Sequence, residues 1–68
     1  MTRLRVNGVE EEVGAATVAD LLRARGVDPA VRFLAVAING AVVRRAEWPS
    51  HPLVAGDDVE IVRPLQGG

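Results

Sequence analysis

Residues 34–43 read LAVAINGAVV, and this stretch predicts the architecture of the chain. Leu34, Val36 and Ile38 alternate with two alanines, which is the period-2 pattern of a half-buried strand. The Asn39-Gly40 pair then separates two apolar runs, and it favours a tight hairpin because both residue types tolerate positive φ. We therefore expect two antiparallel strands joined by a two-residue turn.

The N-terminal segment has the same arrangement. Leu4 and Val6 alternate with arginines, Asn7-Gly8 follows, and residues 9–13 read VEEEV. The pattern predicts a second hairpin, with the first, third and fifth residues of that run on one face and a polar outer face. The two hairpins are too short and too different to count as a sequence repeat.

Residues 17–26 carry the signals of one short helix. Thr17 is a suitable N-cap, and Asp20 stands where a capping-box partner is expected. Gly26 falls where a left-handed residue ends a helix, and Val27 can then pack back on the last turn. The apolar face of this helix consists of Val18, Leu21 and Leu22.

The segment after the second hairpin is irregular up to the last strand. Two prolines exclude a continuous helix or a central strand between residues 44 and 52. A turn at residues 55–57 leads into a strand around Val59 and Ile61, which Pro64 ends.

The predicted element order is β-β-α-β-β-β, which places the chain in the α+β class. We expect a mixed five-stranded sheet that curls around the helix. The last strand should lie at the centre, between the hairpins, because the chain before it is long enough for the crossover that parallel pairing needs. Residues 1–64 form this domain, and residues 65–68 form a flexible tail.

Composition excludes several functional classes. Eight basic and nine acidic residues give a net charge of −1, which argues against a nucleic-acid binder. The chain has no cysteine, and every basic residue is arginine, so thiolate and Schiff-base chemistry are excluded. Neither a secretory signal nor a transmembrane run is visible, so we expect a cytoplasmic protein that does not contact membranes.

The chain ends in Gly67-Gly68. Without side chains, these residues can thread a narrow channel and leave the terminal carbonyl carbon open to a nucleophile. The ionised α-carboxyl is a poor electrophile, so it needs activation, most simply as an acyl-adenylate, before sulfur or an amine attacks it. The alternative is that the terminal glycines are incidental. Leu65, an apolar residue with no core to enter, favours a docking role for the tail.

Several other residues admit both a structural and a functional interpretation. Trp48 either closes one end of the core or docks a partner, and His51 is interpreted as a solvated loop residue because further metal ligands are missing nearby. The charges of the Glu10–Glu12 run are expected to disfavour pairing of this edge strand with a strand of another molecule. Arg44 and Arg45 form either a solvated turn or a contact with an acidic partner.

The outer face of the sheet is a further candidate. Ala35, Ala37 and Val62 should point away from the helix, close to Arg5 and Glu60. Small outward residues let a partner approach the backbone closely, although ordinary sheet surface has the same composition. These residues and the two neighbouring arginines are the candidate partner-facing surface, and no catalytic or metal-binding residue is predicted.

An ordered series of motifs spans nearly the whole chain. It comprises VNG at 6–8, TVADLL at 17–22, VAING at 36–40, VVRR at 42–45, EW at 47–48, GDDVEI at 56–61 and QGG at 66–68. Together with the length, these motifs resemble the β-grasp, ubiquitin-like fold and, more narrowly, the ThiS family, the sulfur-carrier proteins of thiamine biosynthesis. Each motif alone is weak, but their ordered combination ending at diglycine is specific. Pro64 departs from the family pattern.

The resemblance implies that Gly68 carries the chemistry. An E1-like adenylating enzyme would use ATP and magnesium to adenylate its carboxylate, and a persulfide from a cysteine desulfurase would displace AMP to leave a thiocarboxylate. Thiazole synthase would take up that sulfur, with Leu65, Gln66 and Gly67 as the partner-binding tail. The chain itself would be no enzyme and would bind no cofactor.

Two alternatives to this function remain open. The sulfur carrier of molybdopterin synthesis shares the fold and the tail and differs mainly in its partner. A non-covalent ubiquitin-like interaction module would share the fold alone, and its terminal glycines would be incidental.

Overall fold

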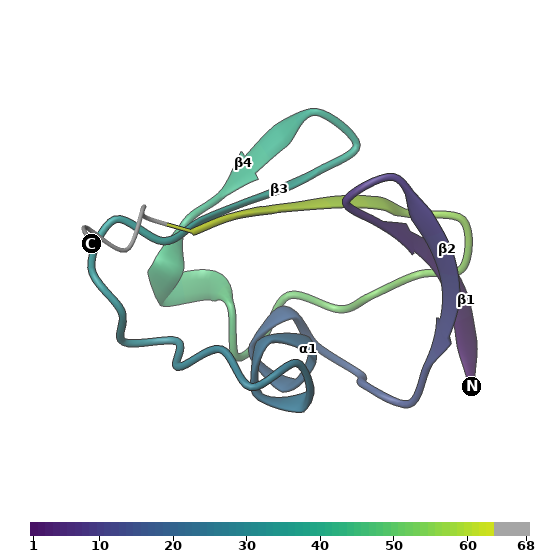
Figure 1. Cartoon of the computed structure of the whole chain (residues 1–68), viewed down its shortest axis with the longest axis horizontal. Helices are drawn as coiled ribbons and strands as arrows, with labels where there is room; N and C mark the ends of the chain where they lie inside the picture. The colour runs from purple at the N-terminus through teal and green to yellow at the C-terminus, as the bar shows by residue number, and fades with distance from the viewer. Residues whose placement is uncertain (64–68) are drawn as a thin grey trace.

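Two hairpins form the two sides of one curled sheet, and a helix lies against its concave face (Figure 1). The computed structural model describes residues 1–63, so Pro64 and the predicted tail lie outside the described residues. The predicted element order is confirmed, and a short 3₁₀ helix is added where an irregular segment was expected. The elements are β1 (Thr2–Val6), β2 (Val9–Val13), α1 (Val18–Ala24), β3 (Ala35–Ile38), β4 (Ala41–Val43), the 3₁₀ helix η1 (Arg45–Glu47) and β5 (Asp58–Val62).

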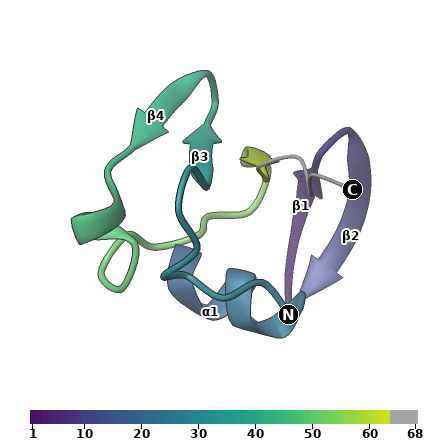
Figure 2. The same ribbon diagram turned by 60° about the vertical axis from the view of Figure 1, so that its left-hand side comes forward.

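The strands lie in the order β2-β1-β5-β3-β4. β5 pairs parallel with β1 and antiparallel with β3, and both hairpins are antiparallel. Figure 2 shows β5 between the two hairpins, with α1 beneath the sheet. The predicted mixed sheet of the β-grasp type, with the last strand at its centre, is confirmed. The C-terminal strand is therefore held on both sides.

An asparagine side chain extends the hydrogen bonding of β5 at each hairpin turn. Asn7 and Asn39 have positive φ of 50° and 53°, as a type I′ turn requires. The N–H of Asn7 donates to Val59 O at 2.9 Å, and its Oδ1 accepts from the N–H of Ile61 at 2.8 Å. The N–H of Asn39 donates to Asp58 O at 2.8 Å, and its Oδ1 accepts from the N–H of Asp58 at 2.9 Å. In each turn the amide oxygen takes the place of a main-chain carbonyl that the left-handed backbone turns away.

Both ends of α1 follow the signals in the sequence. The hydroxyl of Thr17 accepts from the N–H of Asp20 at 3.2 Å, which confirms the N-cap. Within residues 1–63 the Asp20 carboxylate forms no reciprocal bond and lies 3.6 Å from Arg23 instead. At the other end Gly26 has a φ of +74°, and Val27 donates to a carbonyl of the last turn at 2.8 Å. This is the hydrogen bonding of a Schellman motif, and it directs the chain back along the helix.

The space between sheet and helix is filled as predicted. Trp48 also lies there, 2% exposed, and its Nε1 donates to Val43 O at 2.9 Å. Its interpretation as a lid on the core is therefore confirmed, and the docking interpretation is wrong because a buried ring cannot touch a partner. The residues predicted for the core are all between 0% and 7% exposed: Leu4, Val6, Val18, Leu21, Leu22, Val36, Ile38, Val59 and Ile61.

β2 has the predicted alternation, because its register pairs Val9 with the buried Val6 and Glu11 with the buried Leu4. Of the two valines on this inner face, Val13 is buried, whereas Val9 is 61% exposed. Between them Glu11 is half-buried and accepts from Arg25 Nη1 at 2.9 Å. Arg25 is the C-cap of α1, so the helix ends at the level of Glu11. Val9 lies beyond that contact, on an edge strand, and no helical residue covers it.

Candidate functional site

β5 ends beside the start of β3, at one end of the sheet (Figure 1). Val62 pairs with Ala35, the first residue of β3. A segment of five residues spans at most about 18 Å, so an enzyme that acts on the last residue of the chain has to approach this end of the sheet. The site residues predicted for the tail lie outside the described residues: Leu65, Gln66, Gly67 and Gly68.

Four apolar side chains gather on the outer face next to this end. Val62 is 56% exposed, Ala35 is exposed beside it, and Ala37 is half-buried. Val42 is 78% exposed and pairs with Ala37. Residues directly opposite each other share a face of a sheet, so these four residues form one surface, here called the apolar outer patch. The predicted outward direction of its two alanines and Val62 is confirmed.

Val42 was missed as a member of this surface. In the sequence it stands next to another valine, and a run of two valines does not show which one points outward. The register of β4 against β3 decides this, because Val43 pairs with the buried Val36.

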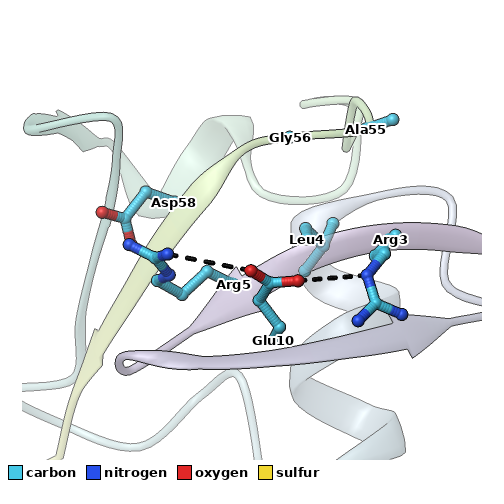
Figure 3. Close-up of a pocket in the computed structure, with 7 residues that line it drawn as sticks. All are labelled: Arg3, Leu4, Arg5, Glu10, Ala55, Gly56 and Asp58. Carbon is cyan, nitrogen blue, oxygen red and sulfur yellow. Dashed lines mark hydrogen bonds and ion pairs between the residues drawn. The ribbon is translucent and has the colours of Figure 1, made fainter.

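The other half of the outer face is charged. Near the start of β5 a depression is lined by two arginines and two carboxylates, and Figure 3 shows Glu10 between Arg3 and Arg5. Its Oε1 lies 3.1 Å from Arg3 Nε, and its Oε2 lies 3.9 Å from Arg5 Nη2. All three side chains are about half exposed or more, so these ion pairs contribute little to stability. The charges largely balance one another, and no catalytic arrangement follows from them.

Arg44 and Arg45 are adjacent in sequence but have different surroundings. Arg45 donates to the carbonyls of Pro29 and Val31, the latter at 2.6 Å, and its guanidinium carbon lies 4.7 Å from the centroid of the Trp48 ring. It therefore fastens the segment before β3 to η1. Arg44 is exposed, and it follows the end of β4 at the level of the apolar outer patch.

No metal site is found among the described residues. Within residues 1–63 no group of three His, Cys, Asp or Glu side chains is placed to hold a metal ion. The main-chain carbonyl of His51 accepts from Val18 N–H at 3.1 Å, which gives this loop residue a structural contact. Neither helix in this part of the chain is long and apolar enough to cross a membrane.

Comparison with known proteins places the chain in a family. The family model of the ThiS family matches residues 4–68. A crystal structure of the thiamine biosynthesis protein ThiS from Geobacter metallireducens is 34% identical, with a TM-score of 0.78 over 98% of this chain and 100% of that one. A solution structure of a thiamine biosynthesis protein from Geobacter metallireducens is 31% identical, with a TM-score of 0.79 over 98% of this chain and 88% of that one. No curated protein sequence shows significant similarity. The chain therefore belongs to the ThiS family, the sulfur-carrier proteins of thiamine biosynthesis.

Proposed function

We propose that this chain carries sulfur as a thiocarboxylate on Gly68 and delivers it for formation of the thiazole ring of thiamine. The observation that carries the proposal is the diglycine terminus, which falls inside the family match and closely follows the central strand. A domain whose central strand is followed within a few residues by diglycine suits a carrier, because partners can bind the domain while they work on the end of the chain.

The chemistry takes place on one carbon atom. An E1-like enzyme joins the Gly68 carboxylate to AMP from ATP, with magnesium balancing the phosphate charge and pyrophosphate leaving. A protein persulfide, loaded by a cysteine desulfurase, then attacks the acyl carbon, and AMP leaves. A thiol then cleaves the sulfur–sulfur bond that came with the persulfide by attacking the sulfur on the donor protein, which yields the thiocarboxylate and a disulfide. Thiazole synthase consumes this sulfur. All these steps belong to the partners, so the chain is a co-substrate and not a catalyst.

The chain's own contribution is recognition. Gly67 and Gly68 suit a narrow channel because they lack side chains, and Leu65 and Gln66 supply contacts on the way in. Ala35, Ala37 and Val62 of the apolar outer patch suit close approach by a partner, since they lie where β5 ends. Arg44 stands at the rim of this surface, whereas the donors of Arg45 are used within the chain.

The proposal is tested by reconstitution with the adenylating enzyme, ATP, magnesium, a cysteine desulfurase and cysteine. The full chain should acquire a group that reacts with a thiol-selective alkylating reagent, and the chain has no cysteine to compete. The matched variants are a Gly68 deletion and Gly67→Val, which change positions after β5 in the sequence and should leave the fold intact. We expect no alkylation of the deletion and sharply reduced alkylation of Gly67→Val. Alkylation of the deletion at the level of the full chain would refute the proposal.

The same experiment separates this function from the alternatives. A non-covalent module would remain unmodified under all conditions. A carrier for molybdopterin synthesis would be loaded but would give up its sulfur to molybdopterin synthase and not to thiazole synthase, so both should be offered to the loaded chain.

A further inference from the structure

Phe33 has an unusual conformation for its residue type. It is 79% exposed, and its φ is +64°. A bulky residue at positive φ is a conformational outlier, because its Cβ crowds the backbone. Asn7 and Asn39 share this conformation, but their amides gain hydrogen bonds to β5 by it. A phenyl ring has no such compensation, so the local structure must hold Phe33 in place.

The contacts on both sides of Phe33 do hold it. Upstream, Arg45 donates to the carbonyls of Pro29 and Val31, which fixes the approaching chain. Downstream, Leu34 is only 6% exposed and anchors the chain in the core. The guanidinium carbon of Arg32 lies 5.6 Å from the centroid of the Phe33 ring. The ring is thus presented to solvent by a fixed backbone, and it loses less entropy on binding than a ring on a loose loop.

Phe33 also lies close to the end of β5, and in the proposed function the chain is modified shortly after that strand. It precedes Ala35 by two residues, which span at most about 7 Å, and Ala35 pairs with Val62 at the end of β5. Phe33 therefore lies near the apolar outer patch, at the end of the sheet where β5 stops.

Two exposed arginines, Arg32 and Arg44, lie near this end, and within residues 1–63 neither forms a salt bridge. Glu60 is the acidic residue nearby, opposite Ala37 on the outer face. Arg63 instead lines a depression together with Glu11 and Glu12. The carboxylate of Glu10, by contrast, lies in the depression near the start of β5, between Arg3 and Arg5. A partner that covers the ring would therefore meet unpaired guanidinium groups around it.

We infer that Phe33 is the aromatic anchor by which the enzyme that adenylates Gly68 docks on this chain. The matching surface of that enzyme is an apolar pocket rimmed by carboxylates. Chain length restricts the occupant to an enzyme that works on Gly68, because such an enzyme must sit within the reach of the tail, and of these enzymes we assign the one that adenylates it. Buried aromatic side chains and arginines dominate the binding energy of such contacts. The inference rests on the proposed function.

The test uses Phe33→Gly, because it separates an anchor from a structural residue. Glycine adopts positive φ without crowding, so the thermal midpoint of this variant should stay unchanged or rise. Its affinity for the adenylating enzyme, measured by calorimetry with the full chain, should fall by about tenfold or more. Phe33→Ala should also weaken binding, and Phe33→Tyr should retain it. Val54→Ala is the matched control, since Val54 is a 58% exposed side chain before the start of β5; its affinity should match that of the unmodified chain.

Each outcome has a clear meaning. Phe33→Gly and Phe33→Ala binding within about twofold of the original affinity would overturn the anchor, as would a loss of equal size in Val54→Ala. A midpoint that falls in step with affinity in Phe33→Gly would make Phe33 a structural residue. The proposed function is tested independently of Phe33: it is wrong if the full chain gains no alkylatable sulfur, irrespective of the affinities of the Phe33 variants. If the full chain does not bind the enzyme at all, both are wrong.

Discussion

The two faces of the sheet use the same strands for different purposes. On the inner face of β3 and β5, Val36 and Val59 are 1% and 0% exposed and pack against α1. On the outer face of the same strands, Ala35 is exposed and Val62 is 56% exposed. The inner face therefore accounts for stability, whereas the outer face contributes little to it and is available for recognition. Apolar residues on both faces look alike in the sequence, so exposure is what separates the two roles.

The largest effect is expected on the inner face. Leu21→Ala removes a side chain that is 1% exposed and leaves a cavity between α1 and the sheet. The free energy of unfolding should fall by about 2–5 kcal/mol, a large part of the total for so small a domain. Urea unfolding measures this, with Val42→Ala as the control from the outer face. If the two variants had equal midpoints, the division between the faces would be wrong.

The neighbouring arginines should differ in the same way. Arg45→Ala breaks the bonds to the carbonyls of Pro29 and Val31 and removes the stacking on Trp48, so a loss of about 1–3 kcal/mol is expected. Arg44→Ala should change the free energy of unfolding by less than about 0.5 kcal/mol, since its side chain is exposed. Thermal unfolding of both variants checks the difference. Equal losses of stability in the two variants would show that the hydrogen bonds of Arg45 do not stabilise the segment before β3.

The two hairpin turns should respond differently to a carboxylate. Asn7→Asp keeps the acceptor for Ile61 N–H and should be tolerated. Asn39→Asp places a second carboxylate beside Asp57, whose Oδ1 now accepts from Asn39 Nδ2 at 3.0 Å, and should cost about 1–3 kcal/mol. Hydrogen exchange of the Ile61 and Asp58 amides reports each turn separately. Equal protection losses in the two variants would contradict the assigned contacts.

The smallest effect on stability is expected in the apolar outer patch. Val62→Thr keeps the branched shape and the strand preference, so the free energy of unfolding should change by less than about 0.5 kcal/mol. Affinity for the adenylating enzyme should nevertheless fall, because a hydroxyl then replaces a methyl group in the contact. Val54→Thr serves as the control, and calorimetry as the measurement. If Val62→Thr lowers the free energy of unfolding but not the affinity, the apolar outer patch stabilises the fold and does not bind the enzyme.

Most of the fold could be predicted because its signals are local. The Asn-Gly turns, the Thr17 cap and Gly26 each act within a few residues, and alternation identified the inner face of β3 and β5. The exposure of Val9 on the inner face could not be predicted, because it depends on where α1 ends. The roles of Arg45 and Phe33 could not be predicted either, since both depend on contacts between η1 and the segment before β3. Such contacts join residues far apart in the chain and leave no periodic signal.

Heavy-sulfur-labelled cysteine can show whether sulfur is carried on Gly68. After reconstitution and alkylation, a protease that cleaves after arginine but not before proline releases residues 46–68 as the C-terminal peptide. This peptide contains neither methionine nor cysteine, so heavy sulfur in it cannot come from those side chains. If Gly68 is the carrier, heavy sulfur will be found at the terminal residue of this peptide, dependent on ATP and absent from the Gly68 deletion. Heavy sulfur retained in the deletion, or none in the full chain, would contradict this prediction.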